Sequence, residues 1–168
     1  MVYASTVNSL LSFRMSELVV RYGGEYLEHG EKDKASAIMK AAGLAEALVS
    51  LLAFLFVAVT AGLAQKYFTE STGVAWMFII YAIGLLANFN VETSTGILQV
   101  THKIQLQGVF NLVQNIVATL IVGAAFLWQG TLPVVLSAYL LGKIILGIGM
   151  FIAAQIQLRK ILGAGWTK

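Results

Sequence analysis

Lys143 is the charged residue whose position most needs a chemical explanation. It lies about halfway along an apolar run that we expect to form a helix over 132–157. An ammonium group in hydrocarbon costs on the order of a few kcal/mol unless it meets water, an opposite charge or a ligand. Lys143 therefore either faces a cavity and holds an anionic group, or it extends to the membrane surface or pairs with Glu46 or Glu92.

Two glutamates are candidates for polar or ion-linked chemistry among the apolar segments. Glu46 lies little more than a turn into a predicted helix over 41–64. It either lines a cavity, or it interacts with the positive end of the helix dipole while reaching headgroup water. Glu92 ends the next helix in a polar run, where it shares a helical face with Asn88 and Thr95. That face suits a water-filled lumen, although a hydrated helix end explains it nearly as well.

A second cationic candidate lies near the start of the chain. Arg14, Glu17 and Arg21 follow at intervals of three and four residues, so both arginines can flank one carboxylate on a single helix face. The simpler interpretation is an ion pair at the membrane boundary. The alternative is capture of a phosphate group, for which a planar guanidinium is better suited than an ammonium.

A neutral polar patch completes the set of candidates. Asn111, Gln114 and Asn115 lie near the start of a predicted helix over 108–128. Amide side chains hydrogen-bond between neighbouring helices in membranes. We therefore favour interhelical hydrogen bonding over a lumen role for this patch.

The composition excludes most soluble functions. Of 168 residues, 58% are hydrophobic and 11% are charged, whereas about a quarter are charged in an ordinary soluble domain. A globule of this size cannot hide that much apolar surface, but a bilayer accepts it. The chain has no cysteine and 2 distant histidines, and no Ser-His-Asp set, Walker loop or zincin motif. We expect no enzyme activity, cofactor or metal site. The net charge of +3 predicts no nucleic-acid partner, because the chain lacks a basic face with enough polar surface to be soluble.

Helices must position these residues. Four apolar stretches approach or reach the roughly 20 residues that cross a hydrocarbon core of about 30 Å. The predicted helices cover residues 2–22, 41–64, 74–95, 108–128 and 132–157, and a cytoplasmic loop over 23–40 forms a helical hairpin or helix extension. The predicted fold is all-α: a single transmembrane domain over 1–168, with four strong spans and a weaker N-terminal helix.

Basic residues gather on one side of the predicted bundle. With alternating crossings, Lys66 alone faces the far side and Lys143 lies within the last helix, which leaves nine of the 11 cations together. These nine are Arg14, Arg21, Lys32, Lys34, Lys40, Lys103, Arg159, Lys160 and Lys168. Because cytoplasmic loops are enriched in Lys and Arg, we expect a multi-pass protein of the cytoplasmic (inner) membrane with this side inward.

Two segments resemble a known family. Residues 9–22 (SLLSFRMSELVVRY), followed by a loop of mixed charge, resemble the end of the second helix in polysaccharide flippases. Residues 92–100 (ETSTGILQV), a short basic turn and residues 107–114 (QGVFNLVQ) resemble that family's fourth-to-fifth helix junction. The chain thus resembles about helices two to six of the oligosaccharide flippase (polysaccharide biosynthesis protein) branch of the multidrug/oligosaccharidyl-lipid/polysaccharide exporter superfamily.

The resemblance implies a transport function. Members usually form two helix bundles around a central cavity and move undecaprenyl-diphosphate-linked sugars outward by alternating access. It implies a fragment or short homologue of such a transporter, holding most of one bundle, with membrane lipid and a polyprenyl-diphosphate-linked glycan as partners. Other transporter helices or polysaccharide assembly subunits are further partners. It also makes Arg14, Arg21, Lys103 and Lys143 the positions to consider for contact with the diphosphate or glycan, and Glu46 or Glu92 for ion coupling.

Two other functions remain open from the sequence. Four strong spans with one intramembrane glutamate also fit a small dimeric proton-coupled multidrug exporter. Such a carrier would require a glutamate that lies deeper in the membrane than Glu46 is predicted to lie, and it would not need Lys143. A noncatalytic subunit of a polysaccharide assembly complex would instead bind other membrane subunits without transporting anything.

Overall fold

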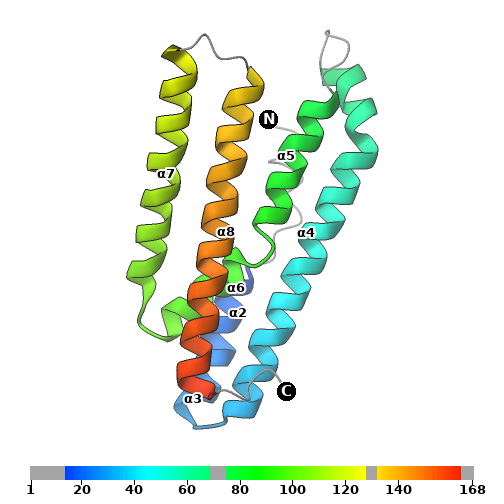
Figure 1. Ribbon diagram of the computed structural model, residues 1–168. Helices are drawn as coiled ribbons and strands as arrows, with labels where there is room; N and C mark the ends of the chain where they lie inside the picture. Colours follow the sequence, from blue (N-terminus) through cyan, green and yellow to red (C-terminus); the bar gives the residue numbers. More distant parts are fainter. Residues whose placement is uncertain (1–13, 69–74, 128–131, 164–168) are drawn as a thin grey trace.

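The protein is a helical bundle, seen in a computed structural model that describes residues 14–68, 75–127 and 132–163. These ranges contain helices and no strand. The elements are α2 (Met15–Leu18), the π-helical turn η1 (Val19–Gly23), α3 (Gly24–Glu28), α4 (Lys32–Phe68), α5 (Ala75–Ala87), α6 (Val91–Val100), α7 (Ile104–Leu127) and α8 (Leu132–Leu162). Figure 1 shows α4, α5, α7 and α8 running along the bundle, with α2, α3 and α6 at its lower end.

Three helical segments in the described residues are long and apolar enough to cross a membrane. They are Lys32–Gly62, Ile104–Leu127 and Pro133–Leu162. Large apolar side chains such as Leu44, Leu120 and Phe126 point outward on these helices. Water would not tolerate so much exposed apolar surface, whereas lipid does. The fold therefore indicates an all-helical membrane protein.

The prediction of one continuous helix over 74–95 is wrong. The segment is divided into α5, which has 13 residues, and α6, with a turn at 88–90 between them. The amide hydrogen of Asn88 bonds to the Leu85 carbonyl at 3.2 Å, which tightens the end of α5. Asn90, at φ −151°, occupies the position before α6 and makes no side-chain cap hydrogen bond, and asparagine is disfavoured in a helix interior. At about 1.5 Å per residue, α5 alone is shorter than the span that the sequence predicted.

The segment predicted as a loop over 23–40 is largely helical. It contains α3, a tight turn, and the first residues of α4, which begins at Lys32. Gly30 makes the turn with φ +75°, a left-handed conformation that glycine adopts without a Cβ clash. Lys34 pairs with Glu31 at 2.8 Å just after it. The helical hairpin alternative is therefore the correct description of this segment.

The helix predicted over 2–22 falls largely outside the described residues. Its last part is seen as α2 and η1, and the helical path continues through Gly23 into α3. Val19 on η1 is fully buried against Met39 and Ile97, from α4 and α6. A Cβ on Gly96 would lie 2.8 Å from the Cβ of Val19 and 2.9 Å from the Ser16 carbonyl oxygen. Glycine at this position thus permits the close approach of α6 to the N-terminal helices.

The cationic ends of the helices share one end of the bundle. Figure 1 places the start of α4, the start of α7 and the end of α8 at the lower end, beside α3. Lys32, Lys103 and Arg159 occupy or adjoin these helix ends. The charge asymmetry along the sequence therefore corresponds to a spatial asymmetry of the described residues.

The turn between α6 and α7 contains a strained residue and gives a first testable prediction. His102 has φ +56°, and the amide of Lys103 donates to the Leu98 carbonyl at 2.7 Å, as in a glycine-type helix cap. His102→Gly should raise the free energy of unfolding by about 0.5–1 kcal/mol, because glycine takes this conformation without strain. Thermal unfolding in detergent measures the change. Thr101→Gly is the control: at φ −88° it should lower stability, and a gain equal to that of His102→Gly would contradict the account.

Candidate functional site

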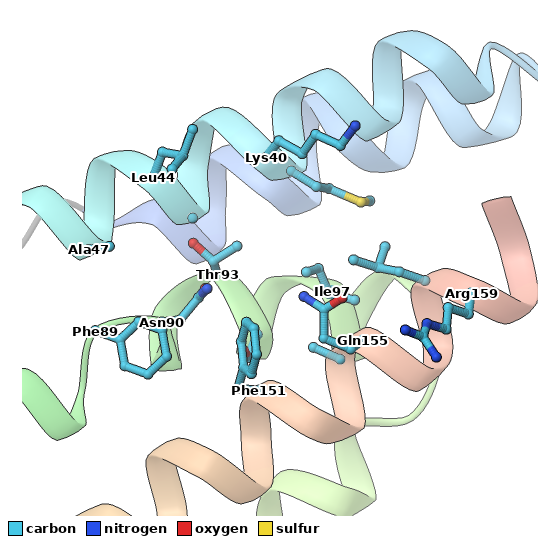
Figure 2. Close-up of a pocket in the computed structure, with 15 residues that line it drawn as sticks. Lys40, Leu44, Ala47, Phe89, Asn90, Thr93, Ile97, Phe151, Gln155 and Arg159 are labelled. Carbon is cyan, nitrogen blue, oxygen red and sulfur yellow. The ribbon is translucent and has the colours of Figure 1, made fainter. Parts of the chain in front are cut away.

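A cavity of about 610 Å³ lies between α4, α6 and α8 at the cationic end of the bundle. Figure 2 shows these three elements around it. Its described lining residues are Met39, Lys40, Gly43, Leu44, Ala47, Phe89, Asn90, Thr93, Ser94, Ile97, Phe151, Ala154, Gln155, Leu158 and Arg159. This set contains two cations, several polar groups and no carboxylate. The cavity therefore favours an anionic or polar group attached to an apolar body.

The two cations of the cavity come from facing helices. Lys40 lies on α4 and Arg159 lies in the last turn of α8. In Figure 2 their side chains lie on opposite sides of the cavity toward one end of it. Arg159 is exposed and Lys40 is half-buried. The cavity is therefore lined by one cation from each of these two helices.

The floor of the cavity is built by the helix break between α5 and α6. Asn90 in the turn and Thr93 and Ser94 on the first turn of α6 contribute polar side chains. Ser94 is 1% exposed, and its hydroxyl oxygen has no hydrogen-bond partner in the described part of the chain. Buried hydroxyls are nearly always hydrogen-bonded. The floor thus has hydrogen-bonding capacity that the protein does not use itself.

One wall of the cavity is apolar and combines Phe89 from the break with Phe151 from α8. Phe89 and Phe151 pack with their ring centroids 5.5 Å apart in a tilted geometry, which is a favourable arrangement for two aromatic rings. Figure 2 shows both rings on the side of the cavity opposite Leu44 and Ala47. Apolar residues therefore surround the space between the polar floor and the cationic end.

Glu46 holds the helix break in place. Its two carboxylate oxygens accept hydrogen bonds from the backbone amides of Glu92 and Thr93, each at 2.8 Å. These amides belong to the first turn of α6, where helical amides have no partner within their own helix. A carboxylate from α4 thus caps the N-terminus of α6, where the helix dipole favours negative charge. Glu46 is a buried positioning residue for the cavity floor, and it does not line the cavity itself.

The sequence placed Glu46 incorrectly. It was expected little more than a turn into its helix, where it would either line a cavity or interact with that helix's own dipole and with headgroup water. Because α4 begins at Lys32, Glu46 is about four turns into the helix, and it is only 8% exposed. The dipole that it meets belongs to α6. This correction depends on tertiary packing, which a single helical pattern does not contain.

Glu92, for which the sequence left a lumen face and a hydrated helix end open, is exposed and contacts the N-terminal helices. Its side-chain oxygen accepts a hydrogen bond from the Ser16 hydroxyl at 2.8 Å, so it joins α6 to α2. Asn88 lies in the turn that separates the two helices, and it does not line the cavity. Because of the helix break, Asn88 does not lie on one helical face with Glu92 and Thr95, as the sequence predicted.

The predicted cations do not converge on the cavity. Arg14 pairs with Glu17 at 2.8 Å, and its side chain is 81% exposed. Arg21 lies 5.4 Å above the ring of Tyr22, and Lys103 is exposed at the α6 to α7 turn. None of these three lines the cavity. The simpler ion-pair interpretation of Arg14 therefore fits the geometry.

Lys143 lies in a different aromatic environment. Its ammonium is 5.7 Å from the centroid of the Tyr139 ring, and that ring stacks on Tyr81 of α5 at 5.8 Å. It forms no salt bridge with Glu46 or Glu92, which make the contacts described above. A cation over an aromatic face is stabilised by the ring quadrupole. Lys143 is thus half-buried beside α5 and does not line the cavity.

The amide patch of α7 is divided between two faces. Gln114 packs on α8, since a Cβ on Gly142 would lie 3.1 Å from its Cγ atom. Asn111 and Asn115 are exposed, and the Asn111 side chain donates to the Gln107 carbonyl of its own helix at 3.0 Å. Gln114 therefore packs between helices, but its buried Oε1 atom has no hydrogen-bond partner in the described residues, so the predicted interhelical hydrogen bonding is not seen for this patch.

Lys40, Arg159, Thr93, Ser94 and Gln155 were not predicted as site residues. The sequence signal for Lys40 and Arg159 was their position near the predicted helix ends on the cationic side of the bundle. Nothing in the sequence distinguished them from the other cations of that side. The position of Ser94 in the first turn of a helix could have been predicted only if the helix break at 88–90 had been recognised first.

Among the described residues, no three His, Cys, Asp or Glu side chains lie close enough together to hold a metal ion. In comparisons with known proteins, no family model, no curated protein and no solved structure matches this chain.

Proposed function

We propose that this chain is a membrane transport protein, or part of one, that translocates lipid-linked oligosaccharide across the cytoplasmic membrane for polysaccharide biosynthesis. In this proposal it forms part of one bundle of a flippase-like transporter and carries out no catalysis. The observation that supports it most is the cavity with cations from two facing helices, a polar floor and apolar walls. Its position at the cationic end of the bundle suits loading from the cytoplasmic side.

The charge and the polar and apolar lining of the cavity support this cargo. A polyprenyl-diphosphate-linked glycan combines negative charge, a polar sugar and a long apolar chain. Lys40 and Arg159 match the diphosphate, because cations lower the cost of bringing phosphate oxygens out of water. Asn90, Ser94 and Gln155 offer hydrogen bonds to sugar hydroxyls. The prenyl chain remains in lipid, so the cavity needs to hold only the head of the cargo.

A binding measurement tests this proposal. Arg159→Gln and Lys40→Gln should each weaken binding of a polyprenyl diphosphate in detergent by about tenfold, since each removes one charge-assisted contact. Tryptophan fluorescence or calorimetry gives the dissociation constants. Lys103→Gln is the matched control, because it removes a cation at the same end that does not line the cavity. Equal losses for all three variants, or no loss for either cavity variant, would refute the assignment.

A small proton-coupled multidrug exporter is the second candidate, and the burial of Glu46 favours it. Such a carrier uses an intramembrane carboxylate that gains and loses a proton. Here both oxygens of Glu46 accept backbone hydrogen bonds, which give the group a structural role. Proton-driven efflux of lipophilic cations from vesicles, lost in Glu46→Gln at equal protein level, would favour the exporter over the flippase.

A further inference from the structure

The outer face of α7 is the least covered surface of the three membrane-crossing segments. In its most apolar stretch 6% of the residues are buried, against 22% in α4 and 33% in α8. A shallow groove runs along this face beside Gly108, Asn111, Asn115 and Thr119. The three polar residues recur every fourth position, so they form one stripe along the helix. Leu112, Ile116 and Leu120 flank the stripe on the same face.

The stripe lies at a depth where lipid offers no hydrogen bonds. Asn115 is eleven residues after the start of α7, or about 17 Å along the helix, which is near the middle of a hydrocarbon core of about 30 Å. Neither Asn115 nor Thr119 forms a side-chain hydrogen bond within the described part of the chain, and both are exposed. A side-chain amide in lipid favours a neighbouring helix that can pair with it.

We propose that this face of α7 is a dimerisation surface and that its occupant is a second copy of this chain. The stripe consists of neutral amide and hydroxyl groups, and each amide both donates and accepts. Two copies inserted in the same direction and related by a two-fold axis place Asn115 opposite Asn115, so each amide satisfies the other. A Cβ on Gly108 would meet nothing within 4 Å, which leaves room for a close helix approach. This surface is separate from the cavity residues and does not depend on the proposed cargo.

Cysteine crosslinking identifies the face, because the natural chain contains no cysteine. Leu112→Cys, beside the stripe, should form a disulfide-linked homodimer in lipid vesicles after mild oxidation. Leu52→Cys is the matched control, since it is also a lipid-exposed leucine, 60% exposed, but on α4. Equal yields for the two variants, or no homodimer at Leu112→Cys, would overturn the proposal. A product with the mass of this chain plus a different protein, formed in native membranes in place of the homodimer, would also overturn it.

The amide role is tested by the dimer dissociation constant in vesicles, measured by energy transfer between labelled copies over a dilution series in lipid. Asn115→Leu should weaken the dimer by about tenfold, because the change removes the same polar contact from both copies. Asn115→Gln keeps the amide and should retain most of the affinity. A monomer at all dilutions, or a dimer that is as tight in Asn115→Leu as in the unaltered chain, would refute it.

Discussion

Replacing Gly147 by alanine should lower the free energy of unfolding by about 2–3 kcal/mol, although alanine is the better helix former by about 1 kcal/mol. Gly147 lies on α8 where the end of α5 crosses it. A Cβ there would overlap the carbonyl group of Ala87, the last residue of α5. Backbone atoms cannot rotate away as a side chain does, so α5 would have to move off α8.

The effect should extend to the cavity floor. Ala87 immediately precedes the turn at 88–90 that leads into α6, so displacement of α5 also shifts the break that carries Asn90 and Ser94. We expect Gly147→Ala to lose thermal stability in detergent and to elute as a broader species in size-exclusion chromatography. Both are measured on the same preparation.

Gly123→Ala is the matched control for this prediction. Gly123 is also a glycine inside a membrane-crossing helix, but a Cβ there would meet nothing within 4 Å. It should be neutral or should stabilise the protein by up to about 1 kcal/mol, which is the propensity difference alone. If the two variants behave alike, the close contact between α5 and α8 is not needed for stability.

Glu46→Ala should cost about 3 kcal/mol, the second large effect. The substitution leaves the amides of Glu92 and Thr93 without the carboxylate that now accepts both hydrogen bonds. Hydrogen bonds to a charged group contribute about 1.5–3 kcal/mol, and an unpaired buried donor costs about 1–3 kcal/mol. Unfolding with increasing denaturing detergent, followed by circular dichroism, gives the difference. The loss should appear first in α6, as faster hydrogen exchange at its first turn.

Two further variants test whether the hydrogen bonds to Glu46 account for this loss of stability. Glu46→Gln retains one acceptor oxygen and should lose about half as much stability as the alanine variant. Glu92→Gln changes an exposed carboxylate that accepts one hydrogen bond from Ser16, so it should cost less than about 1 kcal/mol. Equal effects for Glu46→Ala and Glu92→Gln would show that the cap on α6 does not stabilise the fold.

Helix positions were largely predictable because they depend on local pattern. The predicted helix over 108–128 corresponds to α7 and that over 132–157 to α8, with differences at the ends. Apolar runs of this length have few alternatives to helix in lipid, where every backbone polar group must be paired within the protein. The same pattern failed at 74–95, because the polar run that begins at Asn88 was interpreted as the hydrated end of one helix, whereas a turn at 88–90 divides the segment into two helices.

Site residues were less predictable because they depend on which helices meet. Lys143 had the strongest sequence signal, yet it lies over Tyr139 and away from the cavity. Arg159 had no distinguishing signal and lines the cavity. Charge and depth along one helix do not specify the neighbouring helix, so they predict the cost of a buried cation and not the group that offsets it.

The sequence by itself determined that this chain is helical, that its long segments are apolar enough for lipid, and that its cations cluster at one end. These properties follow from composition and from the period of each helix, which are local. Only the tertiary structure decided that Glu46 on α4 caps α6 and that α4, α6 and α8 enclose a cavity. The reason is that these contacts join residues about 46 positions or more apart, and the register and rotation of packed helices, which no single segment encodes, bring them together.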